Sequence, residues 1–135
     1  MRLPSFLLFV IMVIAIVSCG ETRVSQCNRL NQVVNKISAL PTPQTAHEWI
    51  QLSSQMEAIG AELKGLKLQD PLLVEGRQKL VELTTEAARS AAALGQAIQT
   101  QNNRARNQAI AKIEQLRQRE EPIVNAINQH CSQQA

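Results

Sequence analysis

The sequence predicts an all-α protein: an up-down-up-down four-helix bundle that follows a short apolar leader. Three observations support this prediction. Apolar residues recur every three or four positions through four segments, which is the period of one face of a helix. Residues that start or stop helices separate most of these segments, and the connections are short, which favours antiparallel neighbours. The chain of 135 residues is long enough for one modest domain behind the leader.

The leader has the order of charged and apolar residues that is typical of a cleaved export signal. Arg2 is followed by an uncharged apolar run at residues 6–17. That run is shorter than the roughly 20 residues that a helix needs to cross a bilayer. It ends in Ile-Val-Ser-Cys at residues 16–19, a motif that resembles the lipobox of bacterial lipoproteins.

The resemblance implies that residues 1–18 are a lipoprotein signal peptide and that the mature chain begins at Cys19 with lipid on its sulfur. The protein is then exported and anchored to a membrane, facing the periplasm or a similar lumen, because two or more acyl chains hold firmly. Two alternatives stay open: an ordinary signal peptide in which Cys19 is incidental, and an uncleaved signal anchor. Residues 19–26 are expected to be the lipid anchor and tether, and residues 27–131 the helical bundle.

The three cysteines also fit this interpretation, because lipid on Cys19 leaves Cys27 and Cys131 as a pair. Export places the pair in an oxidising compartment, where disulfides persist. An up-down-up-down bundle brings both cysteines to the same end. We therefore expect a Cys27–Cys131 disulfide; a loop of about 100 residues corresponds to roughly 4.7 kcal/mol, as an upper figure, in the chain-entropy model. The alternative is two unpaired, small apolar side chains.

The first two helices are predicted from their apolar spacing and their ends. Residues 22–39 form the first helix, and the Leu-Pro-Thr-Pro that follows stops it, because proline lacks a backbone donor and restricts the residue before it. Thr45 and Glu48 are spaced as a capping box that starts the second helix, which runs to about residue 65. The apolar stripe of the second helix is Trp49, Leu52, Met56, Ile59, Leu63 and Leu66.

The third and fourth helices have less well-marked boundaries. Asp70 followed by proline is a strong start for the third helix, and the mostly small side chains at residues 87–97 would let a neighbouring helix approach closely. The polar residues 99–103 are the expected reversal, although no proline or glycine marks it and one continuous helix is the alternative. The fourth helix is expected over residues 104–131, with a bend at Pro122.

Several classes of function find little support. Cleavage of the leader leaves Trp49 as the only aromatic residue, whereas sites for single-stranded nucleic acid stack bases on several rings. The nearly neutral charge gives no general attraction to nucleic acid either. The sequence has no phosphate-binding loop and no nucleophile elbow, so we expect neither enzymatic activity nor a cofactor. His47 and His130 fall at opposite ends of the bundle, so we expect no metal site.

Basic residues form a local excess in the fourth helix: Arg104, Arg106, Lys112, Arg117 and Arg119. They are the candidate partner-binding residues, for an acidic protein or for anionic lipid. Helical spacing spreads them around the helix, so an ordinary solvated face is the alternative explanation.

Cys27 and Cys131 bracket about 100 helical residues, with Leu-Lys-Leu-Gln-Asp-Pro-Leu at residues 66–72 in the middle. This pattern is similar to a group of small exported helical proteins of cyanobacteria; the resemblance supports the fold and implies no activity. The leading hypothesis is a membrane-tethered helical interaction or accessory protein with a protein partner. The alternative is a carrier that holds a small ligand or metal in the bundle interior. The small side chains at residues 87–97 could leave a cavity for such a ligand, although close helix packing is the simpler account. A buried polar cluster or a sizeable apolar cavity would favour the carrier, and a solid core with one conspicuous surface patch would favour the interaction protein.

Overall fold

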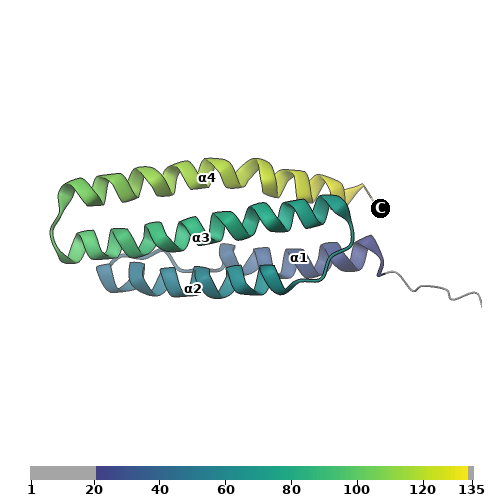
Figure 1. Cartoon of the computed structure of the whole chain (residues 1–135), viewed down its shortest axis with the longest axis horizontal. Coiled ribbons are helices and arrows are strands. Elements are labelled where there is room, and N and C mark those ends of the chain that lie inside the picture. The colour runs from purple at the N-terminus through teal and green to yellow at the C-terminus, as the bar shows by residue number, and fades with distance from the viewer. Residues whose placement is uncertain (1–20, 134–135) are drawn as a thin grey trace, which may run out of the picture.

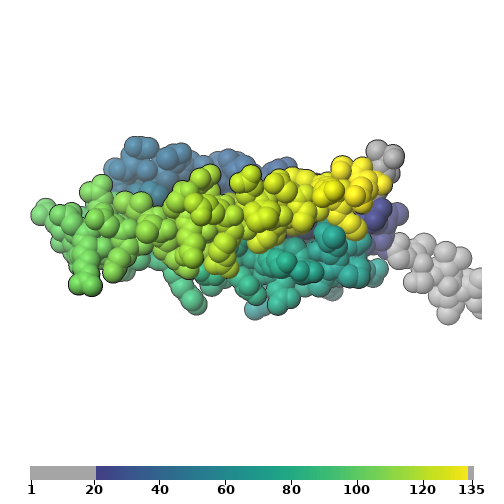
Figure 2. Space-filling view, turned by 90° about the horizontal axis from the view of Figure 1, so that it is seen from above, coloured from purple at the N-terminus to yellow at the C-terminus, as the bar shows by residue number. Residues whose placement is uncertain are grey.

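The structure, a computed structural model, describes residues 21–133. It contains four helices, α1 (Arg23–Ser38), α2 (Ala46–Gly65), α3 (Pro71–Gln99) and α4 (Asn103–Ser132), and no strand in that part of the chain. The helices run up, down, up and down and form an elongated molecule (Figure 1, Figure 2). The predicted all-α four-helix bundle is confirmed. The predicted signal peptide and the lipid site at Cys19 lie outside the described residues.

Side-chain caps start the helices where the sequence predicted them. Thr45 Oγ1 accepts a hydrogen bond from the backbone N–H of Glu48 (3.2 Å), and the Glu48 carboxylate accepts one from the N–H of Thr45 (3.0 Å), so the capping box is complete. Asp70 Oδ1 accepts from the N–H groups of Leu72 (3.0 Å) and Leu73 (3.2 Å) at the start of α3. These caps satisfy donors that a helix start otherwise leaves without partners.

The expected reversal between α3 and α4 exists, although it contains no glycine. Gln101 has a φ of 53°, in the left-handed region. The N–H of Gln101 donates to the carbonyl of Ile98 (3.2 Å), and the N–H of Asn102 donates to that of Ala97 (2.9 Å). This is the hydrogen-bond pattern of a Schellman motif. Asn102 then caps α4, which continues through Pro122 as one helix.

The helices differ in length, and this divides the bundle into two halves. Helix α1 has 16 residues, whereas α3 has 29 and α4 has 30, so α1 lies beside only part of the other helices (Figure 1). We call the part that contains α1 the four-helix half (residues 21–38, 62–82 and 121–133). The remainder is the three-helix half (residues 46–61, 83–99 and 103–120). Its far end contains the α3–α4 reversal and the start of α2.

The main apolar cluster lies in the four-helix half and at its border. Its buried members are Cys27, Leu30, Val33, Ile59, Leu63, Leu73, Leu80 and Ile127. The expected disulfide is present: Cys27 near the start of α1 is bonded to Cys131 near the end of α4, with Cα atoms 5.9 Å apart. Helix α1 is therefore held both by apolar packing and by a covalent link to the last helix.

In the three-helix half, small residues bring α2 and α3 close together. A Cβ atom on Gly95 would lie 2.7 Å from Cγ1 of Ile50 and 2.8 Å from the backbone carbonyl oxygen of Ala46. Both distances are far below van der Waals contact, so only glycine fits at this position. The expectation that residues 87–97 allow a close helix–helix approach is confirmed.

Candidate functional site

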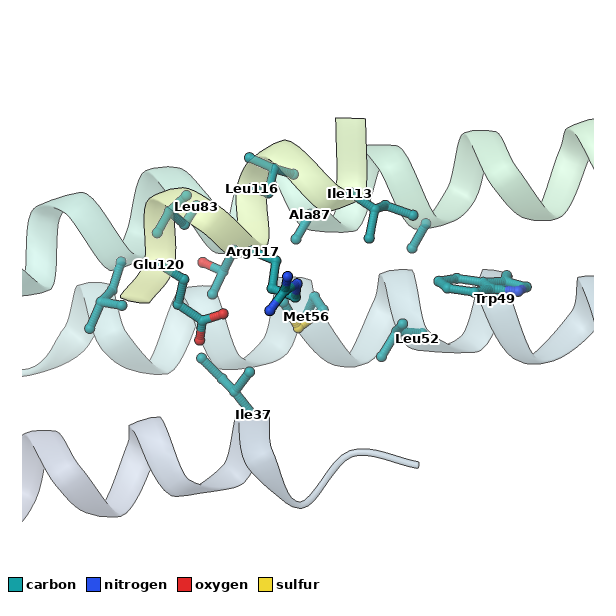
Figure 3. Close-up of a pocket in the computed structure, with 13 residues that line it drawn as sticks. Ile37, Trp49, Leu52, Met56, Leu83, Ala87, Ile113, Leu116, Arg117 and Glu120 are labelled. Atoms are coloured by element: carbon teal, nitrogen blue, oxygen red, sulfur yellow. The ribbon is translucent and has the colours of Figure 1, made fainter. Parts of the chain in front are cut away.

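An apolar groove opens where α1 ends, because none of the helices within residues 21–133 fills this corner of the bundle beyond Ser38 (Figure 3). Helices α2 and α4 occupy opposite corners of the bundle, and no Cα atoms of the two come within 8 Å of each other. The groove between them has α3 as its floor and a volume of about 240 Å³. Its large apolar lining residues are Ile37, Trp49, Leu52, Met56, Leu80, Leu83, Ile113 and Leu116.

The local sequence explains why the groove is there. The prolines after α1 prevent the helix from continuing, and no residue of the 39–45 connection lines the groove. On the floor, Ala87 and Ala91 supply small side chains where larger ones would fill the space. The run of small residues on α3 therefore has two effects: it admits α2 closely at Gly95 and leaves the groove deep at the two alanines.

The floor of the groove offers little to a polar ligand. Thr84 is the polar residue of α3 that lines it, and the Thr84 hydroxyl donates to the carbonyl of Val81 within the same helix (3.0 Å). The surroundings are aliphatic, aromatic or thioether groups. Such a surface favours an apolar occupant, because a polar group buried against it would lose its hydrogen bonds with water.

The α4 edge of the groove is charged. Arg117 and Glu120 extend from α4 over the apolar side chains (Figure 3). The Arg117 guanidinium donates to the Glu114 carboxylate from Nε (3.0 Å) and from the terminal Nη2 (2.8 Å). Hydrogen bonds from Arg117, and then from Gln118, lower the pKa of Glu114, and the bond to Glu114 raises the pKa of Arg117. Both groups are therefore charged at neutral pH.

The candidate basic residues of α4 do not form one surface. Lys112 and Arg119 lie on the flank toward α3, where their nitrogens are 2.9 Å and 3.0 Å from the carboxylate oxygens of Glu86. Hydrogen bonds from Lys112 and Arg119 lower the pKa of that carboxyl group. Arg117 is the member of the set that lines the groove. Arg104 and Arg106 are exposed near the start of the helix.

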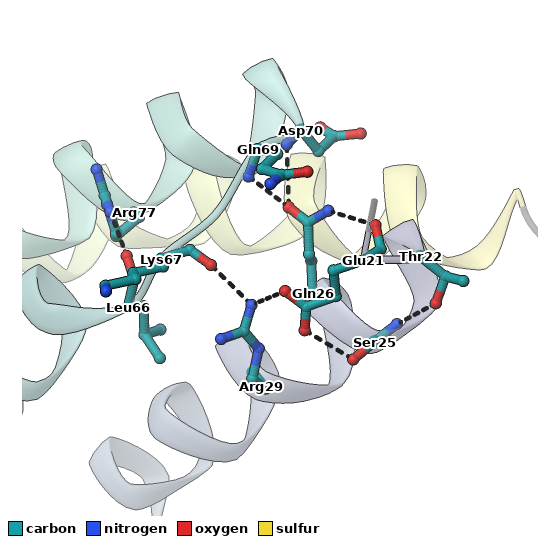
Figure 4. A network of polar contacts seen from close by, with 10 residues as sticks. All are labelled: Glu21, Thr22, Ser25, Gln26, Arg29, Leu66, Lys67, Gln69, Asp70 and Arg77. Carbon is teal, nitrogen blue, oxygen red and sulfur yellow. Dashed lines mark hydrogen bonds and ion pairs between the residues drawn. The ribbon is translucent and has the colours of Figure 1, made fainter. Parts of the chain in front are cut away.

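A network of polar contacts joins the start of α1 to the α2–α3 connection (Figure 4). The buried Gln26 accepts hydrogen bonds from the backbone N–H groups of Gln69 (2.6 Å) and Asp70 (3.0 Å). Its amide nitrogen donates to the backbone carbonyl of Glu21 (3.1 Å). The Gln26 side chain thus forms hydrogen bonds with the backbone of the α2–α3 connection and with the backbone just before α1. Buried polar side chains in folded proteins are normally hydrogen-bonded in this way.

Two arginines extend the same network. Arg29 donates to the backbone carbonyl of Lys67 (2.7 Å) and forms an ion pair with Glu21. Arg77 of α3 donates to the carbonyl of Leu66. The chain is therefore held to the bundle from Glu21 onward, and residues 23–26 belong to α1 rather than to a free tether.

His130 pairs with a carboxylate and not with the other histidine. Its Nε2 lies 2.9 Å from Oδ2 of Asp70, and both side chains are largely buried. Burial alone would raise the pKa of Asp70, but hydrogen bonds from His130 and from the N–H groups of Leu73 and Leu72 outweigh it and lower the pKa. His47 lies near the start of α2, at the opposite end of the molecule. Between residues 21 and 133, no three His, Cys, Asp or Glu side chains are grouped as a metal site would require.

Comparison of the chain with known protein families, with curated proteins and with solved structures found no match. Among the described helices, none combines the length and the apolar character needed to cross a membrane.

The sequence suggested a possible cavity among the small residues 87–97, where Ala87 and Ala91 line the groove, but it did not place an open groove at the end of α1. Trp49 and Met56 fall on the predicted apolar stripe of α2 and were expected in a solid core, but they are only half-buried at the groove wall. One signal was present: the first predicted helix is much shorter than the third and fourth. A bundle with one short helix leaves part of a corner unfilled.

Proposed function

We propose that this protein is a lipid-anchored interaction protein that presents the apolar groove of its three-helix half to a protein partner. The observation that carries the proposal is the groove: an apolar surface with a charged edge, left open by a helix that stops halfway along its neighbours. Apolar side chains that line an open groove are stabilised when a partner covers them, which supports a use of this groove in binding.

A protein partner fits the groove better than a small ligand. Its volume of about 240 Å³ lies below the roughly 300–1,000 Å³ that small-molecule sites occupy. Specific small-molecule sites also contain a few polar groups that orient the ligand. Here the hydroxyl of Thr84 donates within its own helix. The carrier alternative therefore has less support than the interaction protein.

The anchor would place the groove away from the membrane surface. Glu21 is bound to α1, and two residues of chain span at most about 7 Å, so lipid on Cys19 would keep the four-helix half close to the bilayer. Helix α1 has 16 residues, which corresponds to about 24 Å at 1.5 Å per residue. The groove begins where α1 ends, so it would be offered to a partner at that distance along the bundle.

Crosslinking in native membranes tests this proposal with one matched pair of variants. Leu52→Glu adds a carboxylate at the groove wall, and Gln51→Glu adds the same group at the neighbouring, exposed position of α2. We expect Leu52→Glu to lose a crosslinked protein partner that Gln51→Glu and wild type retain. Cys19→Ser should lose the added lipid mass and leave the membrane fraction.

Three results would contradict the proposal or one part of it. Equal crosslinking by wild type and Leu52→Glu would exclude the groove as the partner site. A wild-type protein that purifies alone with a bound apolar small molecule would favour the carrier instead. If the masses of Cys19→Ser and wild type differ only by the exchange of cysteine for serine, the lipid anchor is refuted independently of the groove.

A further inference from the structure

We infer that the groove takes a single amphipathic helix of the partner, seated in the corner of the bundle that α1 leaves unfilled. This inference rests on the proposed function and names the element of the partner that binds. It follows from how α1 itself is packed, from the groove's dimensions, from its lack of backbone hydrogen-bonding groups and from the charges along its edge.

The unfilled corner continues the path of α1 along the bundle. In the four-helix half, the same corner is filled by α1, whose buried residues Cys27, Leu30 and Val33 pack against the other helices. Ile37, near the end of α1, lines the near end of the groove. A second helix placed there would continue the helix–helix packing that the chain already makes in its other half.

The length of the groove matches a short helix. The α2 wall extends from Trp49 to Met56, which is about 10 Å at 1.5 Å per residue, and the floor extends from Leu80 to Ala91, about 16 Å. These lengths correspond to two to three helical turns. A helix of that length presents apolar side chains at positions i, i+3 or i+4, and i+7 along one face.

The lining of the groove favours a helix over an extended peptide. An extended segment keeps its backbone N–H and C=O groups available and needs a sheet edge or polar groups to receive them. The groove is walled by helices α2 and α4, whose backbone groups are bonded within each helix, and its lining is apolar. A helix satisfies its own backbone, so it can enter this groove without unpaired polar groups.

The α4 edge of the groove carries charged side chains that a partner helix can meet. Arg117 stands at the α4 edge of the groove, and Arg106, three turns earlier, has the same helical phase and is exposed. Arg117 donates to Glu114 through two nitrogens, but both side chains are well exposed, so a carboxylate of the partner can approach the same guanidinium from the groove. We therefore expect the partner helix to carry a carboxylate on the edge that faces α4, displaced from Glu120, which also lines the groove.

Site-specific photo-crosslinking of the full protein in its native membrane tests this inference. A photoreactive residue is placed at Met56 on one wall, at Ile113 on the opposite wall, and at the exposed Gln55 as control. Adducts from both walls should converge on one partner segment, at positions three, four or seven residues apart. Control adducts should be absent from that segment. An intact Cys27–Cys131 disulfide in each variant confirms folding.

The alternative outcomes separate this inference from the proposed function. Adducts at every second residue of a partner would indicate an extended peptide and overturn the helix while keeping the partner. Adducts on a second copy of this chain would show that the groove binds another copy of the protein, and the proposal of a separate partner would be wrong. Adducts on lipid, or none from either wall, would overturn both proposals.

A second measurement uses the only tryptophan of the chain, Trp49, which lines the groove. A synthetic peptide of the crosslinked segment is titrated while the emission of Trp49 is followed. Binding should shift the emission to the blue, and Leu52→Glu should weaken it about tenfold or more. Arg117→Gln should weaken binding about two- to fivefold, whereas Arg119→Gln, on the other flank of α4, should leave it unchanged. Equal effects of the two arginine variants would contradict the proposed charge contact.

Discussion

The two halves of the bundle differ in how completely their apolar side chains are covered, although α2, α3 and α4 run through both. In the four-helix half, α1 is held by the Cys27–Cys131 disulfide, by a buried apolar cluster and by the hydrogen bonds of Gln26. In the three-helix half, the same corner is unfilled and Trp49 and Met56 remain half-exposed. The contacts that stabilise α1 and the partly exposed apolar side chains therefore lie in different halves of the molecule. A firmly linked half allows the other half to keep an open apolar groove.

The largest expected effect comes from removing the covalent link. The double variant Cys27→Ser/Cys131→Ser should lower the free energy of unfolding by about 2–5 kcal/mol in urea titrations, because the unfolded chain loses a long closed loop. Amide hydrogen exchange should show the loss of protection mainly in residues 23–38 and 121–132. Residues 46–61 and 83–99 should keep most of theirs.

Reduction supplies the control for the disulfide prediction. A reductant should produce the same change in wild type and no change in the double variant. A uniform loss of protection through all four helices would show that the two halves unfold as one unit, and the distinction between them would then fail.

A glycine substitution in the three-helix half, with a matched control in the other half, tests how closely α2 and α3 pack. Gly95→Ala should lower the free energy of unfolding by about 1–3 kcal/mol, because the added Cβ meets Ile50 and the rigid backbone carbonyl of Ala46. Gly65→Ala, with no atom within 4 Å of the added Cβ, should raise it by up to about 1 kcal/mol through helix propensity. Thermal or urea unfolding measures both. A neutral Gly95→Ala would show that α2 moves freely away from α3 there.

The smallest effect concerns pH and the four-helix half. The pKa of Asp70 is lowered in the folded protein, so its charge stabilises the fold above the ordinary carboxyl pKa of about 3.9. That contribution is lost as pH falls below this value toward the lowered pKa. Asp70→Asn keeps a helix cap but removes the charge, and should cost about 1 kcal/mol at neutral pH.

The readout for Asp70 is the slope of stability against pH. Below about pH 4, the free energy of unfolding should fall less steeply in Asp70→Asn than in wild type. Parallel slopes would mean that other carboxylates account for the acid sensitivity, and that the pair with His130 contributes only to packing.

Local signals were sufficient for the individual helices, whereas the disulfide needed the expected topology as well. Capping by Thr45 and Asp70 depends on residues within one turn, so sequence alone predicts it well. The α3–α4 reversal was predicted from polarity alone. The residue with left-handed backbone conformation is Gln101, so no glycine in the sequence marks the turn. The disulfide followed from cysteine parity and from the topology of an even number of antiparallel helices.

The candidate site could be predicted only in part. Periodicity assigns Trp49 and Met56 to the inner face of α2, but it carries no information on how far the opposing helix extends. Charge composition likewise groups Arg117 with Lys112 and Arg119. The structure separates them, because Glu86 of α3 pairs with Lys112 and Arg119 on the opposite flank.

By itself, the sequence determined which segments are helical and where the second and third helices begin, because caps, prolines and apolar period act over a few residues. The cysteine pairing followed from the cysteine count together with the expected antiparallel topology. Only the tertiary structure decided that α1 covers half of the bundle and that the uncovered half forms an apolar groove. The physical reason is that burial depends on what lies across the interface. A residue on an apolar face is buried only where another element is long enough to reach it.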